Sequence, residues 1–61
     1  MLDEFTERRL KKIATTFCGI HKMKGRKAGG QYLNSMNIHE EHYAIVRALI
    51  EKELAKMGLS L

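Results

Sequence analysis

The chain contains no proline and no tryptophan, and it has a single cysteine among its 61 residues. Without a second cysteine it cannot form an intramolecular disulfide, and a lone thiol is typical of proteins in a reducing compartment. No stretch approaches the roughly 20 apolar residues that a membrane-spanning helix needs, and no signal peptide is recognisable. We therefore expect a cytoplasmic protein that does not enter a membrane.

Carboxylates are absent from the middle of the chain. All seven acids lie outside the interval between Glu7 and Glu40, which holds eight lysines and arginines. The net charge of +4 thus arises from one concentrated basic block. Like charges this close repel each other unless an anion lies near them, so an acidic partner is expected. The basic block consists of Arg8, Arg9, Lys11, Lys12, Lys22, Lys24, Arg26 and Lys27.

Two segments have the apolar periodicity of amphipathic helices, and we expect an all-α fold. The first helix is predicted at about 3–20, where acids in the first turn favour the positive end of the helix dipole. The second is predicted at about 38–57 from its broad apolar face. Asn37 is its expected N-cap, and Gly58 is expected to end it in a left-handed conformation, as in a Schellman motif.

The segment 21–36 between these helices is basic and rich in glycine. Gly25 and the pair Gly29 and Gly30 are poor helix formers, so we expect a connector rather than a regular element. The domain, taken as 1–61, is then a helical hairpin. If residues 31–34 form a helical turn, it is a three-helix unit instead.

A chain of this size buries only about 60% of its unfolded surface and needs additional stabilisation. Disulfides are excluded, and the apolar face of the second helix is wider than one helix of the same chain can cover. We therefore expect homodimerisation to complete the core. The expected interface consists of Leu10, Ile13, Phe17, Ile45, Leu49 and Leu54.

A zinc site is the less favoured alternative for stabilisation. Cys18 and His21, and then His39 and His42, form two pairs at i, i+3. This spacing is near that of some zinc sites, but structural zinc usually takes two or more thiolates. Each of the four residues also has a simpler interpretation, such as a small buried hydrophobe for Cys18. We expect no metal and no cofactor.

The sequence has no arrangement typical of catalysis. Cys18 and His21 are helical neighbours without an oxyanion hole, and a catalytic pocket needs more walls than two helices provide. We therefore expect a protein that is not an enzyme.

The basic block instead predicts a small regulatory protein that binds the phosphates of DNA or RNA. Base stacking is poorly supported, because Tyr32 is the only aromatic near the block. The alternative is an adaptor or inhibitor that docks a basic and apolar helical surface on an acidic protein, of a size that suits a phage- or plasmid-encoded regulator. The expected phosphate contacts are Arg8, Lys11 and Lys12 from the first helix, and Lys22, Lys24, Arg26 and Lys27 from the connector.

Overall fold

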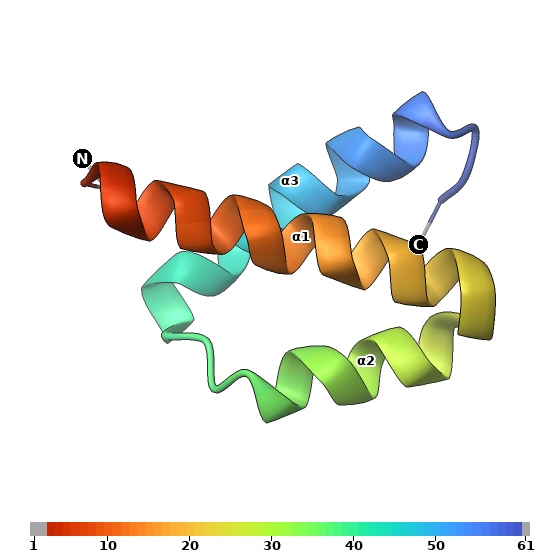
Figure 1. The fold of residues 1–61 in the computed structure, drawn as a ribbon, viewed down its shortest axis with the longest axis horizontal. Coiled ribbons are helices and arrows are strands. Elements are labelled where there is room, and N and C mark those ends of the chain that lie inside the picture. The colour runs from red at the N-terminus through yellow and green to blue at the C-terminus, as the bar shows by residue number, and fades with distance from the viewer. Residues whose placement is uncertain (1–2, 61) are drawn as a thin grey trace.

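The computed structural model describes residues 3–60, which form three α-helices and contain no strand (Figure 1). Helix α1 spans Glu4–Lys24, α2 spans Arg26–Ser35 and α3 spans Glu40–Lys56. The expected all-α class is confirmed, and of the two architectures the three-helix unit is the correct one. Residues 1, 2 and 61 of the predicted domain lie outside the described residues.

Helix α1 begins where the acidic first turn predicted and ends later than expected. The Asp3 side chain caps it by accepting a hydrogen bond from the Thr6 backbone N–H at 2.7 Å. The helix continues past the predicted end at residue 20, because Gly19 lowers helix propensity by only about 1 kcal/mol. Basic residues in the last turn, which ends at Lys24, also interact favourably with the negative end of the dipole.

The expected connector over residues 21–36 is wrong for most of its length. Residues 21–24 belong to α1, and residues 26–35 form α2, so that one residue separates the two helices. That residue is Gly25, whose φ of 97° reverses the chain in a conformation that other residues rarely adopt. Further along, a Cβ at Gly29 would lie 2.7 Å from the ring of Phe17. These glycines therefore allow a tight turn and a close helix–helix approach.

Helix α3 starts later than predicted and ends as predicted. Asn37 is not the N-cap; it has a φ of 49°, and the helix is capped by the Nδ1 atom of His39. At the other end, Gly58 has a φ of 74°. The N–H of Leu59 donates to the Leu54 carbonyl at 2.8 Å, and the Gly58 N–H donates to the Ala55 carbonyl at 3.1 Å, which confirms the Schellman motif.

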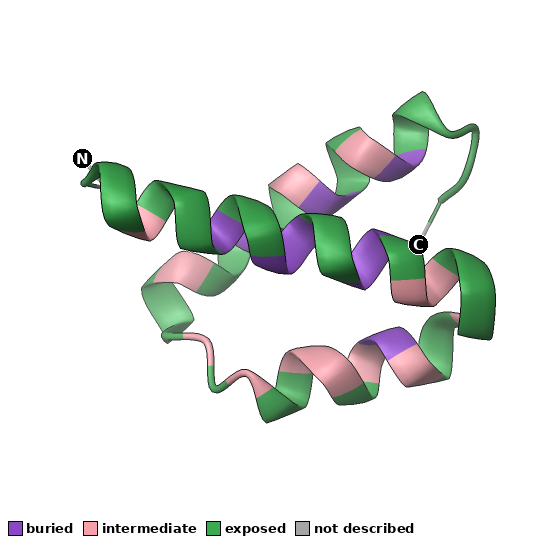
Figure 2. Ribbon diagram, viewed as in Figure 1, coloured by how far each residue is buried: buried purple, intermediate pink, exposed green. Residues whose placement is uncertain are grey.

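Helix α1 is the centre of the arrangement. Helices α2 and α3 each pack on it, but within residues 3–60 they do not approach each other (Figure 1). The buried positions run along the inner sides of α1 and α3, whereas Gly29 is the one buried residue in α2 (Figure 2). One side of the structure, between α2 and α3, therefore stays open. The core consists of Leu10, Ile13, Ala14, Phe17, Cys18, Val46, Ile50 and Leu54.

The core uses most of the residues that we expected at a dimer interface. Four of the six, Leu10, Ile13, Phe17 and Leu54, are at most 3% exposed in the single chain. Of the other two, Ile45 is 37% exposed and Leu49 is half-buried against the core. The helix-to-helix contacts of one chain thus bury side chains that sequence periodicity alone assigned to a partner. Across the described part of the chain, no helix has the length and apolarity to span a bilayer.

Candidate nucleic-acid interface

The basic block lies on the outside of α1 and at the turn between α1 and α2. All eight of its side chains are exposed. Arg8 forms an ion pair with Glu4, one helical turn earlier, at 2.9 Å between Nη2 and Oε1. Within residues 3–60 no other member of the block pairs with a carboxylate. The fold therefore leaves most of this positive charge without an internal counter-charge.

One face of α1 forms a straight row of polar and basic groups. Arg8, Lys12, Thr15 and Lys22 follow each other at spacings of four, three and seven residues, which places them on the same side of a helix. The side chains of all four are exposed. A helix that presents such a row can follow a run of phosphates along a nucleic-acid backbone.

The turn around Gly25 carries four cations within six residues. Lys22 and Lys24 lie in the last turn of α1, where the dipole favours them, but Arg26 and Lys27 open α2, where the dipole opposes them. Helix α2 also has no acidic residue in its first turn and no side-chain N-cap. This arrangement is unfavourable for the isolated helix, and an anion near its N-terminus would relieve it.

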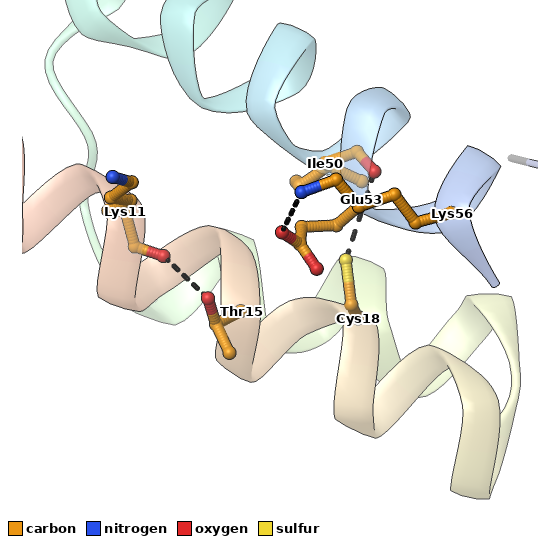
Figure 3. Close-up of polar contacts among 6 residues, drawn as sticks. All are labelled: Lys11, Thr15, Cys18, Ile50, Glu53 and Lys56. Carbon is orange, nitrogen blue, oxygen red and sulfur yellow. Dashed lines mark hydrogen bonds and ion pairs between the residues drawn. The ribbon is translucent and has the colours of Figure 1, made fainter.

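Two lysines outside the basic block join its surface through tertiary packing. Lys52 and Lys56 of α3, with Lys11 and Thr15 of α1, line a groove of about 230 Å³ between the two helices. Figure 3 shows this region, in which the Thr15 hydroxyl donates to the Lys11 carbonyl at 3.0 Å.

Sequence reasoning missed these two lysines because acids surround them along the chain. One of those acids, Glu53, pairs with Lys56 at 3.7 Å between Oε1 and Nζ. The i, i+4 spacing of Lys52 and Lys56 was the available signal that they share a helix face. That this face lies beside Lys11 follows only from the packing of α3 on α1.

A second groove lies on the open side, between α2 and α3, and has a volume of about 170 Å³. Its floor is apolar, since Phe17, Val46 and Ile50 are at most 3% exposed. Other residues that line this groove are more exposed than its floor, and Tyr43 is 43% exposed. The sequence did not associate Tyr43 with the basic block, yet Arg26 of the block lines the same groove. The complete lining is Phe17, Arg26, Gly30, Leu33, Tyr43, Val46, Arg47 and Ile50.

Cys18 is a core residue rather than a reactive group. Its thiol donates to the Ile50 carbonyl at 3.8 Å, which links α1 to α3 (Figure 3). Burial raises the pKa of the Cys18 thiol above its ordinary value, and the negative charge of Glu53 acts in the same direction. A metal ligand or nucleophile needs the thiolate, which this environment disfavours.

The four residues of the zinc alternative are not brought together. The ring of His21 stacks on Phe17 at 5.7 Å between centroids. His39 caps α3, and its ring lies 5.6 Å from that of His42. The part of the chain that the structure describes holds no group of three or more side chains able to bind a metal ion. The simpler interpretation of Cys18 as a small buried hydrophobe matches its position in the core.

The basic surface offers positively charged hydrogen-bond donors. Lysine ammonium groups and arginine guanidinium groups both bind phosphate oxygens, and the guanidinium can do so with two parallel hydrogen bonds. Compared with protein-family models, with curated protein sequences and with solved structures, the chain matches none. What this surface can bind therefore follows from its own geometry and charge.

Proposed function

We propose that this protein is a small cytoplasmic regulator that binds the phosphates of DNA or RNA. The observation that carries this proposal is that seven of the eight exposed side chains of the basic block have no carboxylate partner within residues 3–60. Their mutual repulsion raises the free energy of the free protein. A nucleic-acid backbone removes that repulsion and releases its own condensed counterions.

The proposed contacts come from three parts of the surface. The row on α1 supplies Lys12 and, once released from Glu4, Arg8. The turn around Gly25 supplies a second group, and the lysines of the α1–α3 groove extend the surface on one side. Contacts of this kind position a protein on the backbone without reading bases, so binding is largely independent of sequence. The proposed phosphate contacts are Arg8, Lys11, Lys12, Lys22, Lys24, Arg26, Lys27, Lys52 and Lys56.

The test is fluorescence anisotropy of a labelled oligonucleotide at several salt concentrations. Replacing Lys24, Arg26 and Lys27 together by alanine is expected to weaken binding and to flatten the salt dependence. The slope of log affinity against log salt is negative, and on duplex DNA each lost phosphate contact reduces its magnitude by about 0.9. A matched control replaces the exposed, uncharged Gln31 and Asn34 of α2 by alanine, and we expect it to bind as the wild type does.

Two outcomes contradict the proposal. The first is that the wild-type protein binds no oligonucleotide even at low salt. The second is that the triple substitution and the control have the same affinity and the same salt slope. Circular dichroism of each variant checks that its helices are intact, so that a loss of binding can be told from a loss of fold.

The second candidate is an adaptor or inhibitor whose basic and apolar surface docks on an acidic protein. The observation in its favour is the exposed apolar surface at the end of α3, where Met57 is 43% and Leu59 is 39% exposed. Affinity capture from lysate with and without nuclease separates the two functions. The adaptor function replaces the first proposal if two results are found together. A protein partner is still captured after nuclease treatment, and no oligonucleotide binds at low salt.

Self-association is a separate proposal. Of the residues first expected at the interface, Ile45 and Leu49 keep accessible surface and lie one turn apart on α3. A dimer formed there would cover both side chains without opening the core, and through Leu49 it would also cover part of the α1–α3 groove. We expect sedimentation equilibrium to show a dimer, and Ile45→Glu to abolish it. A stable monomer at micromolar concentration contradicts this proposal and leaves nucleic-acid binding untouched.

A further inference from the structure

We infer that the groove between α2 and α3 receives one unpaired base of a nucleic-acid strand, which gives the protein a preference for single-stranded over fully paired nucleic acid. This inference rests on the proposed phosphate binding and adds a place for the base. In a duplex the bases are stacked and paired inside the helix, so a groove on the protein surface cannot take one without unpairing it.

The size and lining of the groove suit one planar ring. Its volume is about 170 Å³, and its floor is formed by the nearly fully buried Phe17, Val46 and Ile50. An apolar cavity of about 150 Å³ is large enough for a benzene ring, and the second ring of a purine can extend out of this groove because it is open to solvent. Because α2 and α3 do not approach each other, the groove opens outward, and the polar edge of a base can stay in contact with water.

Tyr43 provides an aromatic surface at the same place. It lines the groove and is 43% exposed, so part of its ring is available to a ligand. Bases stack on aromatic side chains with little dependence on sequence, because every base has a flat face. Binding of this kind agrees with phosphate contacts that do not read sequence.

Two arginines line opposite walls of the groove, Arg26 from α2 and Arg47 from α3. Every internal nucleotide has a phosphate on each side of its base, so a pair of guanidinium groups matches the charge of a strand that crosses the groove. Arg26 also belongs to the basic block, which makes the groove continuous with the phosphate-binding turn. Arg47 forms an exposed ion pair with Glu51, at 3.4 Å between Nε and Oε1. Exposed pairs of this kind contribute little stability, so a phosphate can replace Glu51 as the partner of Arg47 at small cost.

Gly30 keeps the groove open. It lines the groove, and a Cβ at this position would meet nothing within 4 Å. A larger side chain at residue 30 therefore occupies space that the fold itself does not use. This makes Gly30 the most direct position for a test.

An acidic peptide with one large apolar side chain is the competing occupant, because it too would satisfy both arginines. The structure favours the nucleotide, since Arg26 adjoins a surface of exposed cations that extends well beyond the groove. A single peptide anchor would leave that wider surface without a partner.

The experiment compares a short single strand with the blunt duplex of the same sequence, using wild-type protein and two groove variants. A 2-aminopurine base within the single strand reports stacking through its fluorescence. We expect the wild type to bind the single strand roughly tenfold more tightly than the duplex, and to change the 2-aminopurine signal. Gly30→Leu and Tyr43→Ala are expected to lose the preference and the signal while their duplex affinity stays unchanged.

Ala48→Leu is the matched control, since it adds a leucine at an exposed position of α3 that does not line the groove. It is expected to behave as the wild type. Gly30→Ala, which favours helix formation, is a further variant at the same position, so a folding defect in Gly30→Leu does not decide the result. Circular dichroism of every variant checks the fold.

Three results overturn the inference. The first is equal binding of single strand and duplex by the wild type with no 2-aminopurine change. The second is a preference that survives both groove substitutions. The third is saturable binding of a synthetic glutamate-flanked phenylalanine peptide that Gly30→Leu abolishes, without any effect on the base. In each case, binding of the duplex shows that the proposed phosphate contacts are correct even though the groove does not bind a base. If no oligonucleotide binds at low salt, both the phosphate contacts and the base-binding groove are overturned.

Discussion

Gly29 and Gly30 are neighbours on α2, yet their missing side chains face different surroundings. A Cβ at Gly29 would lie 2.7 Å from the Phe17 ring, whereas one at Gly30 would meet nothing within 4 Å. Glycine at position 29 lets α2 approach α1 closely. At position 30 it lowers helix propensity and leaves the groove between α2 and α3 open.

Alanine substitutions at these two positions are therefore expected to change stability in opposite directions. Gly29→Ala should destabilise the protein by up to about 2 kcal/mol, because overpacking of the added methyl group against Phe17 costs about 1–3 kcal/mol and the gain in helix propensity returns at most about 1 kcal/mol. Gly30→Ala should stabilise it by up to about 1 kcal/mol through helix propensity. Urea unfolding followed by circular dichroism measures both. If the two substitutions shift the midpoint in the same direction, the proposed close approach of α2 is wrong.

A second prediction at this scale concerns Asp3. The hydrogen bonds from Thr6, of which the backbone N–H is the strongest, lower the pKa of the Asp3 carboxyl below its ordinary value of 3.8. The folded state thus prefers the charged form, and its contribution to stability is complete above pH 3.8 and is lost as pH falls through the lower folded value. Asp3→Asn keeps an acceptor at the cap but removes this titration.

We expect the melting temperature of the wild type to exceed that of Asp3→Asn near neutral pH. The difference should shrink as pH falls below 3.8. Thermal melts of both proteins across this range test the prediction. Because the other carboxylates titrate in both proteins, their effect cancels in the difference. A difference that is independent of pH would show that Asp3 makes no charge-dependent cap.

At the scale of the elements, α2 differs from its neighbours. It has one buried residue, whereas α1 has five and α3 has three. Its first turn carries Arg26 and Lys27 with no acid, and no side chain caps it. The same two side chains that oppose the helix dipole are proposed phosphate contacts. Stability and binding are thus expected to favour different residues here.

Lys27→Glu tests that conflict. An acid in the first turn interacts favourably with the dipole, so the substitution should stabilise the protein by about 0.3–1 kcal/mol. The same change should weaken nucleic-acid binding, since it replaces a contact by a repulsive charge. Lys27→Gln separates the two effects, because it removes the cation without adding an anion. Urea unfolding and fluorescence anisotropy provide the two measurements, and a parallel loss of stability and binding would contradict the prediction.

At the scale of the whole molecule, Phe17 connects the three helices. It is 3% exposed in the core, contacts Gly29 of α2 and lines the groove beside Val46 and Ile50 of α3. A domain of 61 residues has a free energy of unfolding of roughly 3–9 kcal/mol. Loss of this one side chain therefore threatens the whole fold.

Phe17→Ala is expected to lower the free energy of unfolding by about 3–5 kcal/mol, which is a large part of the roughly 3–9 kcal/mol of a domain of this size. Phe5→Ala is the matched control, because Phe5 is 79% exposed. It should change stability by no more than about 0.5 kcal/mol. Circular dichroism melts of both variants decide the matter. A cooperative melt of Phe17→Ala close to that of the wild type would show that the core does not depend on this residue.

The sequence by itself predicted what depends on near neighbours along the chain. Apolar periodicity and the acids of the first turn predicted α1 and α3, and Gly58 predicted the end of α3, because helical spacing and left-handed glycine act within one or two turns. The concentration of basic residues between Glu7 and Glu40 was also visible directly. These properties need no knowledge of which segments meet in space.

Only the tertiary structure decided which distant residues lie together. It placed Gly29 against Phe17, and so made a helix of a segment that local propensity predicted as a connector. It buried Leu10 and Leu54 in the core of a single chain, whereas apolar periodicity does not distinguish an internal core from an interface between chains. It also brought Tyr43 to the groove that Arg26 lines. Helix packing determines such contacts, and the pattern of a single helix shows which face is apolar but not what will cover it.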